Sequence, residues 1–172
     1  MVYLDIIVLE CLADQPRHGY EIKRIVQRVL GGSVSLNNNV LYPALRRFEE
    51  MGAVDKTVEQ HEGRPPRHVY RLTDTGREIL DDLVRDFPPD AAQDDNEFLT
   101  RVAFFERLEP ADRRQILEAR RRALRLRLEH LQRLAPDAAD SGPWSKRVLD
   151  FVARGVGLEL EWVDELLRAA GQ

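Results

Sequence analysis

Apolar residues recur at helical spacing three times in the first third of the chain. The first stripe consists of Leu4, Ile7, Val8, Cys11 and Leu12. A turn is predicted at residues 15–19, and the second stripe follows it at Ile22, Ile25, Val26 and Val29. The third stripe, between three asparagines and Gly52, is Leu41, Leu45 and Phe48. Because this spacing places apolar side chains on one face of a helix, the pattern predicts three successive helices.

The hydrophobic period changes from helical to alternating after Gly52. Apolar and polar residues alternate over 54–59, and a second strand is predicted over 69–72. The polar connection between them, residues 60–67, contains Gly63 and two prolines that are flanked by Arg64 and Arg67. This order predicts a β-hairpin with a basic tip.

The rest of the chain is predicted to be helical. Thr75 and Glu78 have capping-box spacing and would open a fourth helix that ends near Phe87. Residues 87–96 are rich in proline and acidic residues and predict a linker. Helical stripes follow at 98–105, 110–134 and 144–170, with a break at 136–143. We therefore expect a first domain at 1–86, a linker at 87–96 and a helical domain at 97–172.

Length and composition fit one compact domain or two small ones. The chain has 172 residues, of which 43% are hydrophobic and 33% charged, so a packed core is expected. One cysteine, Cys11, excludes an internal disulfide framework and a multi-cysteine zinc site. The first residues include Asp5 and Glu10 and lack a basic start, and no apolar run approaches the roughly 20 residues of a transmembrane helix. These features predict a cytoplasmic protein.

Charge is unevenly distributed along the chain. The formal net charge is -4, yet residues 16–72 contain ten Lys and Arg against six Asp and Glu. The first domain thus has a cationic segment, while the remainder is acidic. This distribution indicates an anionic partner for one part of the chain only.

Three helices followed by a hairpin is the element order of a winged helix-turn-helix. In that fold the third helix enters the DNA major groove and the hairpin lies against the backbone or the minor groove. The face opposite the core of the third helix carries Asn39 and Arg46, flanked by Tyr42 and Arg47. Asparagine can pair with adenine, and arginine with guanine or phosphate. The predicted DNA-binding residues are Lys23, Asn37, Asn38, Asn39, Tyr42, Arg46, Arg47, Arg64 and Arg67.

Five segments resemble the PadR family of bacterial transcriptional regulators, and the resemblance covers about residues 1–85. The segments are Leu9–Leu12, His18–Ile22, Val40–Glu49, Gly63–Thr73 and Thr75–Glu78. Pro43 has no N–H to donate. A proline is therefore expected either in the first turn of the third helix or at a kink in that helix. The resemblance accommodates this residue, since the third helix of the family commonly contains Leu-Tyr-Pro-Ala-Leu.

The resemblance implies a homodimer that is held by its C-terminal helices, binds pseudo-palindromic operators and usually represses. It places Tyr42, Arg46, Arg64 and Arg67 at DNA contacts. Two departures change the base-contacting region. Val40 stands where the family often has a small hydroxyl residue, and Asn38-Asn39 stands where it often has Pro-Gly. The operator sequence therefore cannot be transferred from a relative.

The expected fold class is mostly α with a small β-hairpin: an N-terminal winged helix-turn-helix plus a C-terminal helical dimerisation domain. Close approach of two helices would explain Gly155 and Gly157, which each cost about 1 kcal/mol in a helix relative to alanine. The predicted dimerisation residues are Val148, Val152, Val156, Trp162, Val163 and Leu166. A small-molecule effector of unknown identity could release the DNA only if it bound the DNA-incompetent geometry of the dimer more tightly than the DNA-competent one.

Several features of the sequence allow two interpretations. The Arg-rich helix between 113 and 133 is either a nucleic-acid surface or, as we favour, a solvated face. Trp144 and Trp162 either line an aromatic effector pocket or, more commonly for tryptophan, anchor a core or an interface. The long C-terminal helices also allow an alternative function, in which the chain is a protein-interaction module.

An enzyme is the least favoured class. His18 and Glu21 have the spacing of helical metal ligands, but no further histidine or carboxylate cluster accompanies them. The lone Gly155-Val-Gly157 follows no predicted strand, so it does not indicate a nucleotide-binding loop. No activated nucleophile or paired carboxylates are evident. We therefore expect no catalytic residue, no metal and no cofactor.

Overall fold

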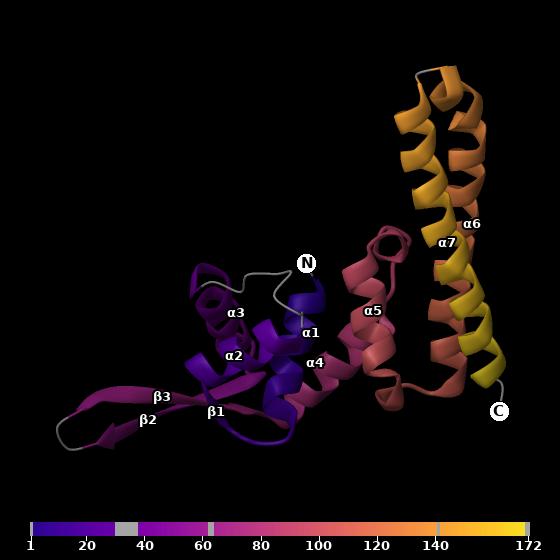
Figure 1. The fold of residues 1–172 in the computed structure, drawn as a ribbon. Coiled ribbons are helices and arrows are strands. Elements are labelled where there is room, and N and C mark those ends of the chain that lie inside the picture. The colour runs from indigo at the N-terminus through magenta and orange to yellow at the C-terminus, as the bar shows by residue number, and fades with distance from the viewer. Residues whose placement is uncertain (1, 30–37, 62–63, 141, 171–172) are drawn as a thin grey trace. The chain divides into compact units, whose positions relative to one another are not determined.

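The computed structural model describes residues 2–29, 38–61, 64–140 and 142–170, and the chain forms two compact units, Met1–Asp86 and Phe87–Gln172 (Figure 1). The first unit contains α1 (Val2–Ala13), β1 (Arg17–His18), α2 (Gly19–Val29), α3 (Asn38–Glu50), β2 (Val54–His61), β3 (Arg64–Leu72) and α4 (Asp74–Arg85). The second contains η1 (Ala91–Gln93), α5 (Asp95–Ala103), η2 (Phe105–Arg107), α6 (Pro110–Asp140) and α7 (Pro143–Ala169). The predicted fold class, mostly helical with an N-terminal winged helix-turn-helix and a helical C-terminal part, is confirmed.

The sheet of the first unit has three antiparallel strands in the order β1-β3-β2. The predicted hairpin is β2 and β3, and its pairing extends from Val54 with Leu72 to His61 with Arg64. The strand β1 was not predicted, because residues 15–19 have the composition of a turn. Arg17 and His18 pair with Tyr70 and Val69 of β3. A two-residue strand leaves no periodic signal, so only its tertiary pairing reveals it.

The core of the first unit is built on α1, whose residues from Tyr3 to Leu12 are almost all buried. The predicted stripe of α3 is also buried: Leu41, Leu45 and Phe48 have at most 2% of their surface exposed. Gly52 ends this helix with a φ of 70°, and the Ala53 N–H donates to the carbonyl of Phe48. This burial fixes which side of α3 faces the solvent.

Two helix boundaries of the first unit differ from simple expectations. Pro43 lies in the second turn of α3, and the helix continues through it to Glu50. The helix α4 begins before the predicted cap at Thr75. Thr73 is its N-cap, since its hydroxyl accepts from the Gly76 N–H at 3.0 Å and donates to the Gly52 carbonyl at 2.7 Å. That second bond ties the start of α4 to the end of α3, which a local pattern cannot indicate.

The second unit is organised around two buried arginines. Arg120 of α6 donates to Glu159 of α7, Asp95 of α5 and the Ala92 carbonyl of η1. Arg101 of α5 donates to the backbone and side chain of Glu97. Each arginine has 1% of its surface exposed, so these bonds replace the water that its charge has lost.

Two predicted features of the C-terminal half take a different form in the structure. The predicted linker, residues 87–96, includes η1 and the start of α5, and Ala91 and Ala92 are buried. The predicted break at Pro136 is wrong, because α6 continues to Asp140. Gln132 and Pro136 are both exposed, so water can reach the carbonyl that the proline leaves without an N–H partner.

Candidate nucleic-acid interface

The solvent-facing side of α3 carries four of the predicted DNA-binding residues. Asn38, Asn39, Tyr42 and Arg46 are all exposed, and Tyr42 has 44% of its surface accessible. Arg46 makes no ion pair with any residue that the structure describes, so its guanidinium is available to a ligand. The helix thus presents amide, phenol and guanidinium groups, which are the groups that read bases and bind phosphates.

Arg47 is held differently from its neighbour Arg46. Its Nη2 donates to Oδ1 of Asp5 in α1 at 2.6 Å. Its guanidinium also lies 5.0 Å from the centre of the Phe48 ring. Arg47 therefore links α3 to α1, and this contact gives it a structural role in the first unit.

Lys23 and Asn38, which were both predicted to contact DNA, contact each other. The Lys23 Nζ donates to Oδ1 of Asn38 at 3.1 Å and so joins α2 to the start of α3. The bond orders two polar side chains on neighbouring helices. Asn37, the other candidate at this end of α3, lies outside the described residues.

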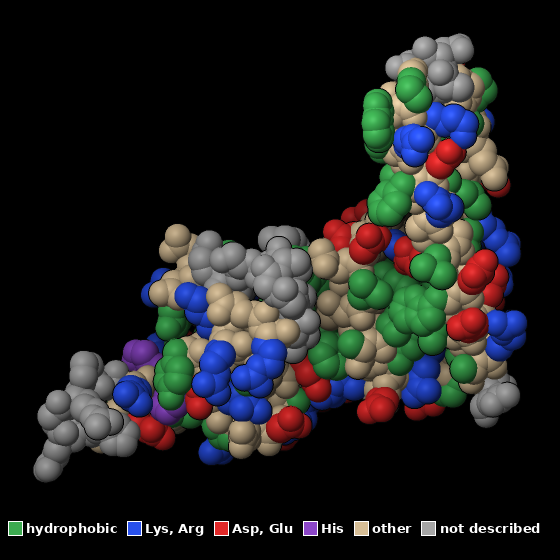
Figure 2. Space-filling view, in the orientation of Figure 1, with side chains coloured by type: hydrophobic (Ala, Val, Ile, Leu, Met, Phe, Trp, Pro, Cys, Tyr) green, Lys and Arg blue, Asp and Glu red, His purple; other side chains and the backbone are tan. Residues whose placement is uncertain are grey.

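The hairpin contributes exposed polar residues on β3. Arg67 and His68 are exposed, at positions opposite Glu59 and Val58 of β2. Arg64 begins β3, but its side chain lies outside the described part of the structure. Lys and Arg side chains (blue) are visible on the exposed surface of this unit in Figure 2. The hairpin can therefore present cationic groups together with α3.

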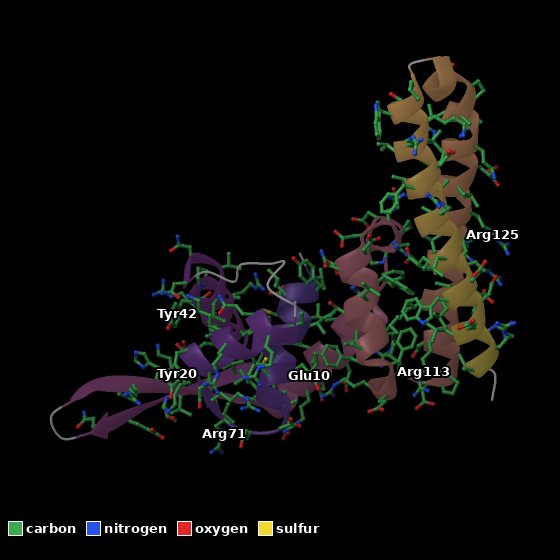
Figure 3. The ribbon with its side chains drawn as sticks, in the orientation of Figure 1. Glu10, Tyr20, Tyr42, Arg71, Arg113 and Arg125 are labelled. Atoms are coloured by element: carbon green, nitrogen blue, oxygen red, sulfur yellow. The ribbon has the colours of Figure 1, made fainter. Side chains whose placement is uncertain are left out.

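The ring of Tyr42 lies against the first residue of α2. A Cβ placed on Gly19 would be 3.0 Å from Cε1 and 3.2 Å from the hydroxyl oxygen of Tyr42. These distances are too short for a comfortable contact, so glycine leaves room for the ring. Figure 3 shows Tyr42 and Tyr20 on the same part of the first unit.

A pocket of about 560 Å³ lies where the start of α2, the side of α3 and β3 meet. It is lined by His18, Gly19, Tyr20, Tyr42, Arg67, His68 and Tyr70. Sequence reasoning did not assign His18 or Tyr20 to the interface, and it left His68, beside the wing, as either solvent-exposed or phosphate-contacting. The only local signal for these residues was the short His18–Ile22 motif. The residues come together through the pairing of β1 with β3, which a local sequence pattern does not indicate.

The predicted dimerisation residues do not share one exposed face in the second unit. Val156 and Val163 are buried, with 4% and 0% of their surfaces exposed. Trp162 packs edge-on against Phe98 of α5, with ring centres 6.0 Å apart. Val152 and Leu166 are half-buried, and Val148 alone is widely exposed at 64%.

A different row of apolar residues is exposed along the first half of α7. Trp144, Val148, Phe151 and Leu158 have 77%, 64%, 71% and 70% of their surfaces accessible. At 100° per residue they fall within about 80° of arc, and Gly155 lies in the same row. A Cβ on Gly155 would meet no described atom within 4 Å. We call Trp144, Val148, Phe151, Gly155 and Leu158 the α7 stripe; hydrophobic side chains (green) are visible at the surface of this hairpin in Figure 2.

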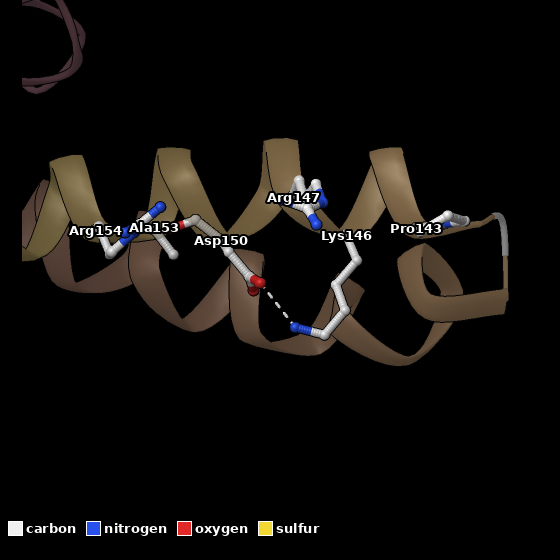
Figure 4. Close-up of a pocket in the computed structure, with 6 residues that line it drawn as sticks. All are labelled: Pro143, Lys146, Arg147, Asp150, Ala153 and Arg154. Atoms are coloured by element: carbon white, nitrogen blue, oxygen red, sulfur yellow. Dashed lines mark hydrogen bonds and ion pairs between the residues drawn. The ribbon is translucent and has the colours of Figure 1, made fainter.

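Basic side chains occupy the surface of α7 beside the α7 stripe. An open hollow of about 940 Å³ is lined by Pro143, Lys146, Arg147, Asp150, Ala153 and Arg154 (Figure 4). Lys146 Nζ bonds Asp150 Oδ2 at 2.7 Å, and the Arg147 guanidinium lies 5.4 Å from the Trp144 ring centre. All six residues come from one helix, so the hollow is a shallow surface feature and does not enclose a ligand.

The Arg-rich helix α6 uses its arginines in different ways. Arg120 is buried, Arg114 pairs with Glu118 at 3.1 Å, and Arg121 pairs with Asp164 at 3.4 Å. Arg125 projects from the outer side of the helical hairpin, as labelled in Figure 3. Part of the arginine run therefore stabilises the second unit.

Among the described residues, no three His, Cys, Asp or Glu side chains come close enough together to hold a metal ion. None of the helices in the described segments combines the length and the hydrophobicity of a membrane-spanning segment.

Sequence comparison places a known domain on the first unit. Residues 8–82 match the model of the Transcriptional regulator PadR-like family. The probable transcriptional regulator Rv1176c of Mycobacterium tuberculosis is 33% identical over 73 residues, which are 42% of this chain and 39% of that protein. An uncharacterized protein of Lysinibacillus sphaericus, protein X, is 26% identical over 85 residues, which are 49% of this chain and 78% of that protein.

Structure comparison finds chains of similar length. The crystal structure of Bacillus subtilis PadR in complex with operator DNA has 20% sequence identity and a TM-score of 0.48, and the match covers 99% of this chain and 98% of that chain.

Proposed function

Because residues 8–82 form a PadR-like transcriptional regulator domain, we propose that this protein binds duplex DNA through α3 and the β2–β3 hairpin and regulates transcription. The observation that carries the proposal is the exposed row of Asn39, Tyr42 and Arg46 on the face of α3 opposite its buried core. A helix with this distribution can lie in the major groove with its polar residues at base edges.

The proposed contacts differ in the support they have from exposure and pairing. Arg46 and Tyr42 are exposed and point away from the core, so they are the strongest candidates on α3. Arg67 is the strongest described candidate on the hairpin. We propose that Arg47 acts mainly through its ion pair with Asp5 and does not contact the DNA directly. Lys23, Asn38 and Asn39 stay in the proposed interface, together with Asn37 and Arg64.

The first experiment is a selection of duplex DNA from a random pool by the full-length protein. The recovered sequence is then tested by fluorescence anisotropy at two salt concentrations, with the Tyr42→Ala/Arg46→Ala double variant as the control. We expect salt-sensitive binding, because Lys and Arg release counterions from DNA, and a marked loss in the double variant. Failure to enrich any sequence, together with no binding at low salt, would refute the DNA-binding function.

The protein is further proposed to act as a homodimer through the α7 stripe. Large apolar side chains at this spacing and exposure are unfavourable on a monomer in water. On the same side of α7, Phe98 of α5 covers Trp162, whereas no described residue covers Trp144, Val148 or Phe151 to that extent. A second copy of the helix would cover them. Close approach of two helices would also explain Gly155, where an added Cβ would meet no described atom within 4 Å.

Replacement of Phe151 by glutamate tests this dimer. We expect the wild-type protein to sediment as a dimer and Phe151→Glu to sediment as a monomer. The matched control is Leu126→Glu, which changes an exposed leucine on α6 outside the α7 stripe. A Phe151→Glu variant that remains a dimer would overturn this assignment of the interface.

Repression is the proposed regulatory outcome, by a dimer that occupies a promoter and excludes the polymerase. A reporter gene behind a promoter containing the selected DNA sequence checks this step. We expect lower expression with the wild-type protein and full expression with the Tyr42→Ala/Arg46→Ala variant. Higher expression in the presence of the wild-type protein would show an activator instead. A releasing effector would be found as a small molecule that weakens binding to the same DNA.

A further inference from the structure

The pocket at the start of α2 combines flat rings with one cationic side chain. Its volume is about 560 Å³, and its described lining consists of Gly19, Arg67 and five side chains with flat rings: His18, Tyr20, Tyr42, His68 and Tyr70. No Asp or Glu is among these residues. Flat rings favour a ligand with a flat ring of its own, and a guanidinium favours an acid group.

Two stacked rings form one side of this pocket. The rings of His18 and Tyr20 lie nearly parallel, with centres 5.5 Å apart and planes 12° apart. The His18 ring is itself held in place, because its Nδ1 donates to the His68 carbonyl at 3.2 Å. Tyr20 is the more exposed of the two, with 56% of its surface accessible. A flat ligand ring can therefore stack on Tyr20 and cover ring surface that faces water.

The charges around the pocket favour a doubly charged anion beside Arg67. Glu59 of β2 lies opposite Arg67 in the register of the hairpin, and its Oε2 is 3.8 Å from Nε2 of His18. An acid group at Arg67 must compete with this carboxylate, so a phosphate monoester with about two charges binds better than a singly charged carboxylate. Burial raises the pKa of Tyr70, and Tyr42 and Glu49 raise it further, so the Tyr70 hydroxyl adds no negative charge.

We propose that this pocket binds a free nucleoside monophosphate, with the base stacked on Tyr20 and the phosphate at Arg67. The two halves of such a ligand match the two kinds of group in the lining. The volume lies within the range of about 300–1,000 Å³ that is typical of small-molecule sites. The bases of duplex DNA are paired and stacked inside the double helix, so they cannot stack on Tyr20 in this way. The free nucleotide thus uses the pocket through a group that the duplex does not offer.

The nucleotide would act on DNA binding by direct competition. Tyr42 and Arg67 belong both to the pocket and to the proposed DNA contacts, so a bound nucleotide and a bound duplex exclude each other. This consequence rests on the proposed DNA-binding function, whereas the binding of the nucleotide does not. At a free nucleotide concentration ten times its own Kd, the apparent Kd for DNA should rise about tenfold.

Calorimetric titration of the full-length protein without DNA tests the site by itself. The four ribonucleoside monophosphates are titrated first, and the nucleotide that binds most tightly is then compared with its nucleoside and with ribose 5-phosphate. Each half should bind at least about tenfold more weakly than the whole nucleotide. Failure of all four nucleotides to bind at millimolar concentration overturns the proposal. Equal affinity for benzoate, which has a ring and a carboxylate but no phosphate, overturns it as well.

Two substitutions separate the base from the phosphate. Tyr20→Ala removes the stacking surface, so it should weaken nucleotide binding about tenfold and leave ribose 5-phosphate binding unchanged. Arg67→Gln should weaken nucleotide binding to a similar extent and leave nucleoside binding unchanged. Arg71→Gln, which changes an exposed arginine of β3 outside the lining, is the matched control. Full nucleotide affinity in both Tyr20→Ala and Arg67→Gln would place the ligand elsewhere and refute the assignment.

A competition titration with the selected DNA completes the test. The tightest nucleotide should raise the apparent Kd for DNA in the wild type, as followed by fluorescence anisotropy, and should have little effect in Tyr20→Ala. A nucleotide that occupies the pocket without changing the Kd for DNA would overturn the competition. If the wild type binds the nucleotide but no DNA, the proposed function has failed and the assignment of the pocket stands.

Discussion

The guanidinium of Arg47 lies 2.6 Å from the carboxylate of Asp5, so one of two adjacent arginines on α3 is fixed to the body of the first unit. Arg46, one residue earlier, has no ion-pair partner among the described residues. The two side chains are identical in chemistry and differ by about 100° around the helix axis. Because of this difference in direction, Arg46 can contact a ligand, whereas Arg47 stabilises the first unit.

Arg46→Ala should weaken binding to the selected DNA by about 1–3 kcal/mol if the side chain reads a base. Arg47→Ala should have a smaller effect on DNA binding, because its charge is already paired. Its ion pair is partly exposed, so its loss should lower the free energy of unfolding by at most about 1 kcal/mol. Anisotropy titrations and urea unfolding of the two variants provide the comparison. Equal losses of DNA affinity would show that Arg47 also contacts the DNA.

Gly19→Ala should impair DNA binding through Tyr42. The new methyl group would lie 3.0 Å from the Tyr42 ring and would push it out of its position over α2. The ring is 44% exposed and can move outward, so we expect a small change in stability. Affinity for the selected DNA should fall toward that of Tyr42→Ala. In a Tyr42→Ala background, Gly19→Ala should have no additional effect, and an additive loss would contradict this coupling.

Arg120→Met should destabilise the second unit by about 1–3 kcal/mol, since it removes the hydrogen bonds to Asp95 and Glu159 and leaves the buried Ala92 carbonyl without its donor. Arg114→Met is the matched control on the same helix. Its guanidinium is exposed and, within the described part of the chain, pairs with Glu118 alone, so a change within about 0.5 kcal/mol is expected. Both tryptophans belong to the second unit, and their fluorescence during urea unfolding measures its stability directly. Similar losses in the two variants would argue against a special role for Arg120.

Cys11 should make the stability of the first unit fall at alkaline pH. Burial raises the pKa of its thiol to about 11, with Glu10 raising it slightly and Arg17 lowering it. The unfolded thiol ionises near pH 9, while the folded thiol keeps its proton until about pH 11. Stability is therefore undiminished below pH 9 and decreases as pH rises from 9 to 11, by an amount on the order of 2–3 kcal/mol.

Cys11→Val isolates this contribution from other groups that titrate in the same range. The difference between wild type and Cys11→Val in the free energy of unfolding should be constant below pH 9. It should then change between pH 9 and 11, to the disadvantage of the wild type. A difference that stays constant up to pH 11 would show that burial does not suppress ionisation of this thiol. Urea unfolding followed by circular dichroism across this range makes the measurement.

The sequence by itself determined the main elements of the first unit. The period of Leu41, Leu45 and Phe48 fixes the buried face of α3, and helix geometry then requires Tyr42 and Arg46 to face outward. The alternation of apolar and polar residues over 54–59 predicted a strand of the hairpin, because successive side chains of a strand point to opposite faces. These conclusions depend only on neighbours in sequence, so no knowledge of distant residues was needed.

The tertiary structure decided how these residues are used. Arg47 pairs with a carboxylate 42 residues earlier, and the pocket joins Tyr20 to Arg67 and His68 through the pairing of β1 with β3. On α7, several faces carry apolar residues, and the residues predicted for dimerisation include both buried Val156 and Val163 and exposed Val148. Packing of Phe98 on Trp162, and burial of Val156 and Val163, leave the α7 stripe exposed instead. A helical period shows that a face is apolar, but which element covers it depends on contacts between residues far apart in the chain.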